Sequence, residues 1–236
     1  RGADRMLPSE TVSRFLDDAG HRFDVLERDG VAAVPDLVGS LTGEDARVLA
    51  TEILTGDAED ASRLPRALVE AADGPDDLIT AAGGDLALVL RRMGVVDPGR
   101  GLVICDAAGA LLRRKPVAGF PLPVMGAGCP LWPVYTALGQ PGRPLTVVVE
   151  TPDGAGWRVH AIAQAVAVAG FGAAPVIRAT MLLTRTHSGG AGAPVGPGCR
   201  VCPRAECLAR REPSVLSTRP DMLDMVDLTG DTLPRS

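Results

Sequence analysis

A change of periodicity near residue 95 constrains the fold of this chain more than any other feature. Before it, apolar residues recur at helical spacing, as at Val12, Phe15 and Leu16. After it, apolar residues form short runs separated by turn residues, which is typical of strands. We therefore expect a mainly helical region over residues 1–95, followed by an α+β domain over residues 96–187.

The helical region carries its own start and stop signals. Thr42 with Asp45 three residues later forms a capping pattern, and Gly56 predicts the end of that helix. Each of these helices has one apolar face that needs a partner, so we expect a small bundle, or packing on whatever precedes Arg1. Because the chain begins with arginine rather than methionine, we expect it to be a piece of a longer protein.

Two hairpins are expected in the α+β domain. The run GLVICDAAGALLRR has a turn at residues 106–109, and LTVVVETPDGAGWRVHAIAQAVAV turns at residues 152–154. A fifth strand is expected at residues 175–184, and CPLWPVYTALG predicts one helix between the hairpins. Strand pairs around an inserted helix favour a small antiparallel sensor domain of PAS or GAF type.

Composition excludes several classes of function. Apolar residues make up 46% of the chain, yet no apolar run approaches the roughly 18 residues that would suggest a membrane span. The net charge of −5 repels phosphates, so any contact with DNA must come from a local patch or another segment. Five cysteines is an odd number, which argues against a secreted disulfide framework and for a reducing cytoplasm.

Three cysteines lie within nine residues, at Cys199, Cys202 and Cys207. Two thiolates three residues apart can bind one metal ion, and the third can return to it if a helix begins at Pro203. Cys129, just before a proline, is the best fourth ligand. Cys105, the remaining cysteine, is expected to be an ordinary buried thiol.

The cysteine spacing is compatible with two kinds of metal centre. Four thiolates suit a [4Fe–4S] cluster, whereas His187 would complete a zinc site of three cysteines and one histidine. A zinc-stapled interaction module without redox function is therefore the alternative to an iron–sulfur domain. We expect no enzyme, because HExxH, GxSxG and phosphate-loop patterns are all absent from the sequence.

Two motifs resemble a known family. GFPLPVMGAGCPLWPVYTAL (119–138) and PVGPGCRVCPRAECLARREPS (194–214) are similar to the C-terminal domain of the short-chain fatty acyl-CoA-responsive transcriptional regulators, which are XRE-type helix-turn-helix proteins. The resemblance implies a cytoplasmic bacterial regulator that binds DNA through a domain absent from this chain, usually as a homodimer. It also implies acyl-CoA sensing and, for some relatives, a redox-sensing [4Fe–4S] cluster, here on Cys129, Cys199, Cys202 and Cys207.

A basic run offers candidate ligand contacts. Arg113, Arg114 and Lys115 precede the apolar Phe120, and arginine forks match the phosphate oxygens of CoA. A solvated strand end is the other interpretation of the same run. Beyond it, residues 188–198 resemble a Gly/Pro linker that opens a cysteine-rich segment over residues 188–218, and residues 219–236 form an acidic tail.

Overall fold

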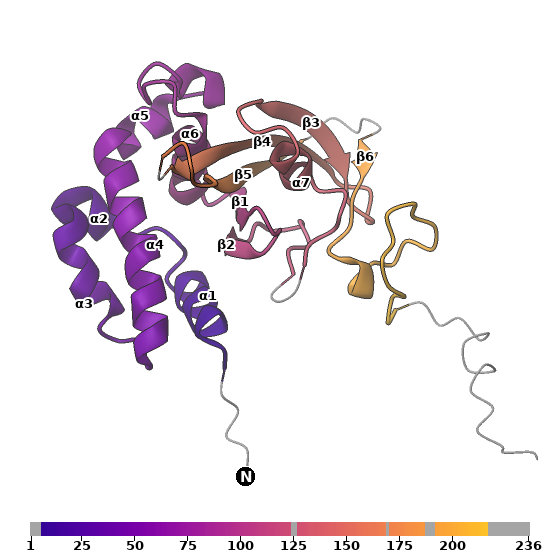
Figure 1. Ribbon diagram of the computed structural model, residues 1–236, viewed down its shortest axis with the longest axis horizontal. Coiled ribbons are helices and arrows are strands. Elements are labelled where there is room, and N and C mark those ends of the chain that lie inside the picture. Colours follow the sequence, from indigo (N-terminus) through magenta and orange to yellow (C-terminus); the bar gives the residue numbers. More distant parts are fainter. Residues whose placement is uncertain (1–5, 124–126, 169, 187–191, 217–236) are drawn as a thin grey trace, which may run out of the picture.

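The structure, a computed structural model, describes residues 6–123, 127–168, 170–186 and 192–216. Its N-terminal part is helical, as expected (Figure 1). The α-helices there are α1 (Pro8–Asp18), α2 (Asp24–Asp29), α3 (Val34–Val38), α4 (Glu44–Arg63), α5 (Arg66–Ala71) and α6 (Leu86–Val96), with 3-10 helices at Gly30–Ala33 and Pro75–Leu78.

Helices α1 to α4 form a bundle with its own core. Ala50 and Leu54 of α4 are fully buried in it against apolar residues of the three shorter helices. The predicted helix end at Gly56 is wrong, because α4 begins after Gly43 and continues to Arg63. Buried positions continue beyond the glycine, and this packing outweighs the roughly 1 kcal/mol that a glycine costs inside a helix.

The C-terminal part is a six-stranded sheet in the described part of the chain, which confirms a mixed α+β fold. Its order is β2-β1-β5-β4-β3-β6, and neighbours are antiparallel except for the parallel pair β3–β6. Both predicted hairpins and the fifth strand are present. The strands are β1 (Arg100–Asp106), β2 (Leu111–Lys115), β3 (Leu145–Glu150), β4 (Gly156–Ala167), β5 (Val176–Arg185) and β6 (Ala193–Pro194).

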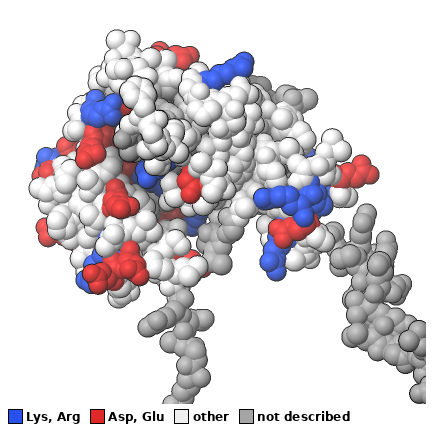
Figure 2. Space-filling view, in the orientation of Figure 1, with Lys and Arg blue, Asp and Glu red and all other residues white. Residues whose placement is uncertain are grey.

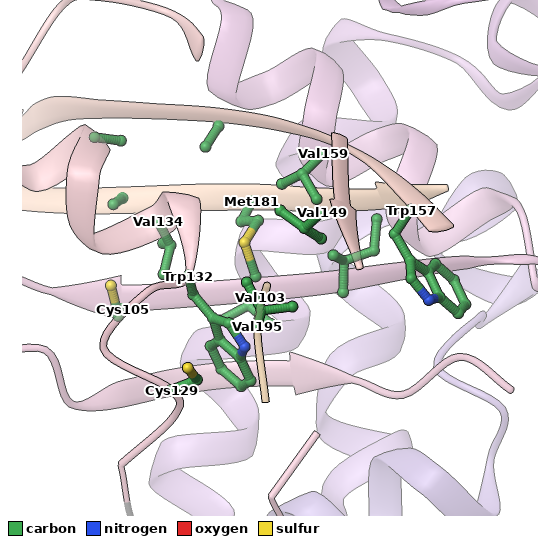
Figure 3. Close-up of a cluster of buried hydrophobic side chains, with 14 of the residues drawn as sticks. Val103, Cys105, Cys129, Trp132, Val134, Val149, Trp157, Val159, Met181 and Val195 are labelled. Carbon is green, nitrogen blue, oxygen red and sulfur yellow. The ribbon is translucent and has the colours of Figure 1, made fainter. Parts of the chain in front are cut away.

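Helices cover both faces of the sheet. On one face α6 packs against Ile162 and Leu182. This helix lies so close to β1 that a Cβ on Gly94 would be 2.9 Å from the Cβ of Leu102. On the other face lies α7 (Pro133–Leu138), over a core that contains the fully buried Trp132 and Trp157 (Figure 3).

Helix α7 is shorter than predicted. The sequence favoured one helix from residue 129, but residues 129–132 lie outside α7. Trp132 has an extended backbone before the first turn, and Pro133 stands at the first helical position. Proline suits that position because an N–H there would have no partner within the helix, and because the φ angle of proline already matches the helix.

Buried ion pairs join the helical bundle to β2. Arg113 forms a bidentate pair with Asp57 of α4, and Arg114 pairs with Asp17 of α1 at 2.7 Å.

No described helix is long and apolar enough to cross a membrane. His187 and the predicted tail at residues 219–236 lie outside the described residues.

Candidate functional site in the cysteine-rich segment

Part of the predicted Gly/Pro linker belongs to the sheet. Of the predicted linker, residues 192–198 are described, and they include β6. Val195 is fully buried and its N–H donates to the carbonyl of Glu150 at 2.9 Å. A Cβ on Gly192 would lie 2.6 Å from the backbone of Val149, so the chain contacts β3 closely here.

Gly196 brings two of the predicted ligand cysteines together. Its N–H donates to the thiol of Cys129, and a Cβ at this position would lie only 2.7 Å from the Sγ of Cys202. Its carbonyl accepts a hydrogen bond from Nε1 of Trp132 at 2.9 Å. The tail is therefore held beside Cys129, whose position among the buried side chains Figure 3 shows.

Cys199 lies in a basic environment. Its Sγ accepts a hydrogen bond from the backbone N–H of Arg211 at 3.4 Å. Burial raises the pKa of the Cys199 thiol, but the backbone N–H and the guanidinium of Arg211 outweigh that effect and lower it overall. The same guanidinium donates to the carbonyl of Gly128 at 3.1 Å, which ties the segment to the loop before Cys129.

The helix expected after Pro203 is not formed. The segment has a 3-10 turn at Cys199–Val201, followed by turns and irregular backbone to residue 216. Arg210 explains the difference, because its guanidinium donates to the carbonyls of Cys199 at 3.2 Å and of Arg204. In a helix, the carbonyl of Arg204 would pair instead with the N–H four residues on.

The four predicted ligands fit a metal centre in kind, but they do not form a closed site here. Cys129, Cys199 and Cys202 are buried, and Cys207 is half-buried. Burial raises the pKa of Cys129, and the neighbouring charges of Cys202 and Cys207 raise it further, so these three share one neighbourhood. Within the described residues, however, no group of three or more His, Cys, Asp or Glu could hold a metal ion.

The fifth cysteine lies where the sequence predicted. Cys105 is fully buried in β1, and burial raises the pKa of its thiol to about 11. Trp132 and Tyr135 stack with ring centroids 6.4 Å apart. Trp132 lies in the core and Tyr135 packs against it.

The basic run of β2 does not face solvent. Arg113, Arg114 and Lys115 are all buried, so the interpretation as a solvated strand end is wrong. Lys115 donates to the carbonyls of Asp97 at 2.8 Å and Arg100 at 2.6 Å. Burial lowers its pKa to about 8.

Phe120, the fourth candidate ligand contact, also lies in the core. Its ring packs edge-on against Trp157, with the ring centroids 5.3 Å apart. The ring of Trp132 is tilted against it, at a centroid distance of 5.9 Å. Phosphate binding by the arginines of β2 stays a prediction, but in this structure their charges are balanced by aspartates.

Sequence reasoning missed those aspartates. Asp57 stands three residues after Leu54 and four after Ile53, so it falls on the apolar stripe of its helix. A carboxylate in such a stripe is a signal for a buried partner, because an unpaired buried charge is strongly destabilising.

Charge is unevenly distributed over the surface. Residues 199–216 hold four arginines and two glutamates, whereas the whole chain has a net charge of −5. Figure 2 shows basic side chains grouped over this C-terminal segment and acidic side chains over the helical part. Any anionic partner of the described surface would therefore meet the cysteine-rich segment more favourably than the bundle.

The class of domain is shown by a match to a known family. The family model of the short-chain fatty acyl coenzyme A regulator, C-terminal, matches residues 99–222 of the 236 in this chain. The chain belongs to this family.

Particular relatives agree with that assignment. The propionyl-CoA carboxylase regulator of Cereibacter sphaeroides is 30% identical over 79% of this chain and 45% of its own length. The HTH-type transcriptional regulator RamB of Mycobacterium tuberculosis is 32% identical over 47% of this chain and 27% of its own. The chain thus spans less than half the length of these curated relatives.

A solved structure shares the fold. A Mycobacterium tuberculosis transcriptional regulator superposes with a TM-score of 0.73 at 19% identity, covering 90% of this chain and 95% of that one. At this identity the likeness concerns the fold alone. It includes the helical region, which the family model does not reach.

Proposed function

We propose that this chain is the regulatory part of a bacterial transcriptional regulator and controls DNA binding by a separate helix-turn-helix domain. The match of the family model to residues 99–222 carries this proposal. The relatives named as transcriptional regulators support it, as does the acidic charge of the chain, which is unsuited to DNA contact. The proposed role is ligand-dependent control in the cytoplasm, not catalysis.

The proposed effector is a short-chain acyl-CoA. The description of the matching family names this class of molecule, and one relative is named for propionyl-CoA carboxylase. An effector controls a regulator only if it binds one conformation more tightly than the other. Acyl-CoA must therefore contact elements whose relative position changes.

The direct test uses a longer protein that includes the DNA-binding domain. We expect propionyl-CoA to change its affinity for operator DNA by about fivefold to a hundredfold, the usual range of allosteric coupling. Fluorescence anisotropy with labelled DNA measures this at one fixed salt concentration. An unchanged affinity with bound propionyl-CoA would rule out the proposed control. The homodimer stays a prediction that sedimentation of the same sample addresses.

The proposed cofactor is a [4Fe–4S] cluster on Cys129, Cys199, Cys202 and Cys207, with zinc as the alternative. Three buried thiols and the arginines of the segment support a bound anionic cluster. A bound cluster supplies one-electron chemistry and sensitivity to oxidants. Gly196 would position Cys129 and Cys202, and Arg211, which lowers the pKa of the Cys199 thiol, would favour its thiolate form.

Anaerobic purification distinguishes the two metals. We expect a brown protein with absorption near about 400 nm and about four iron atoms per chain. The variant Cys129→Ser should lose the iron and the colour, whereas Cys105→Ser, which changes a buried core thiol, should keep both. A colourless protein with one zinc per chain would instead support the zinc-stapled module.

A further inference from the structure

A groove opens between the helical bundle and the first hairpin of the sheet. Its volume is about 530 Å³. Helices α1 and α4 form one wall and residues 108–114 form the other. The lining is mainly apolar and includes Leu7, Val12, Leu16, Leu49, Ile53 and Leu111.

The groove fits part of an acyl-CoA, not the whole molecule. Ligand pockets typically measure about 300–1,000 Å³. A volume of about 530 Å³ suits a short acyl chain with part of the pantetheine arm. The adenine nucleotide would then remain outside the groove.

Two arginines are among the polar residues of the groove, which also include Ser9, Glu10 and Ser13. Arg113 and Arg114 line it, and the Nε atoms of both are buried without a hydrogen-bond partner in the described structure. Their charges are already balanced by Asp57 and Asp17. After a small rotation of the arginine side chain toward the groove, a neutral acceptor such as a thioester or amide carbonyl would satisfy such an N–H without adding a second negative charge.

We propose that this groove binds the acyl chain and thioester end of a short-chain acyl-CoA. This inference rests on the proposed function and names its site. The ligand would contact α1, α4 and the hairpin at once, so it would bridge the bundle and the sheet. Binding at this junction would bias their relative position, which is how an acyl group could be signalled to the rest of a longer protein.

A tryptophan placed in the groove tests the site. Ser13 lines the groove on α1, whereas its neighbour Arg14 is exposed and does not line it. Ser13→Trp should fill the space, and Arg14→Trp is the matched control. Isothermal titration with propionyl-CoA, CoA and propionate measures the affinity of each protein for each ligand.

The acyl preference is the decisive quantity. We expect the unmodified protein to bind propionyl-CoA roughly tenfold more tightly than CoA, because about two methylene-sized groups become buried. Propionate should bind negligibly. Ser13→Trp should abolish the tenfold preference, and Arg14→Trp should retain it.

The outcomes separate the site from the function. If Ser13→Trp keeps the full preference, the groove is not the acyl site, although the proposed function stands. If the unmodified protein binds no acyl-CoA, the proposed function fails and the groove assignment fails with it. Should Ser13→Trp not fold, Ala110→Trp fills the groove from the hairpin wall and must also lose the preference.

Discussion

Asp57 lies on α4 with only 5% of its surface exposed, and its carboxylate accepts two hydrogen bonds from Arg113. Removing one partner of a buried pair leaves an uncompensated charge. We therefore expect Asp57→Ala to lower the free energy of unfolding by about 3–5 kcal/mol in urea titrations. Glu59→Ala, an exposed change on the same helix, should cost less than about 0.5 kcal/mol. A loss below 1 kcal/mol for Asp57→Ala would contradict the role assigned to the pair.

His21 is a second buried group at the junction of α1 and β2. Burial lowers its pKa to about 4, partly opposed by the hydrogen bond of Nε2 to Asp17 at 2.7 Å. The charges of Arg113 and Lys115 lower it further. The imidazole is therefore neutral in the folded protein at neutral pH.

This shift predicts a loss of stability in mild acid. In the unfolded chain His21 takes up a proton below pH 6.5, whereas in the folded protein it does so only below about pH 4. The contribution of His21 to the free energy of unfolding is thus fully present above pH 6.5. It is lost as the pH falls toward 4, and the total loss is about 3 kcal/mol. His21→Asn tolerates the backbone φ of 61° and removes the titration. In urea titrations between pH 4 and 7, the free energy of unfolding of this variant should depend less on pH than that of the unmodified protein. The same dependence in both proteins would show that His21 does not cause the loss of stability.

Helix α6 depends on its N-terminal cap. Asp85 accepts a hydrogen bond from the N–H of Leu88 at 3.0 Å and pairs with Arg63 at 3.1 Å. We expect Asp85→Ala to lower the free energy of unfolding by about 1–2 kcal/mol, because a buried helix start loses its acceptor. Asp45→Ala, in the exposed first turn of α4, should change it by less than half as much. Thermal unfolding of both variants provides the comparison.

The indole of Trp132 is one of the groups that hold the cysteine-rich segment against the sheet domain. Trp132→Phe keeps an aromatic ring in the core but removes the hydrogen bond to the buried carbonyl of Gly196. We expect the free energy of local opening of residues 195–202 to fall by about 1–3 kcal/mol, which is measured as faster hydrogen exchange in these residues. Exchange in α4 should not change. Uniformly faster exchange throughout the protein would indicate global destabilisation rather than release of this segment.

At the scale of the whole molecule, the bundle and the sheet share buried contacts. Helix α6 packs on the sheet and on α4, and Arg91 of α6 pairs with Asp60 of α4 at 2.6 Å. We therefore expect the helical part and the sheet to unfold together. Both tryptophans lie in the sheet domain, so their fluorescence reports on the sheet, while circular dichroism at about 222 nm reports mainly on the helices. Separate midpoints for the two signals would show that the parts unfold independently.

The sequence predicted the secondary structure well wherever local signals decide it. The hairpins at Asp106–Gly109 and at Pro152–Gly154 formed as expected, because turn residues act over a few positions. The errors occurred where distant partners decide. Gly56 did not end its helix, and Pro203 did not begin one, since buried neighbours and Arg210 compete with local propensity.

The sequence by itself determined the change from a helical part to a sheet with two hairpins, the family and the cysteines to consider, since periodicity, turns and motif spacing are local properties of the chain. Only the tertiary structure decided that the basic run of β2 is buried against Asp57 and Asp17, that Gly196 lies beside Cys129 and Cys202, and that a groove is lined by both the bundle and the first hairpin. These features join residues far apart in the chain. Their partners are selected by packing and by the need to neutralise buried charge, which no local pattern encodes.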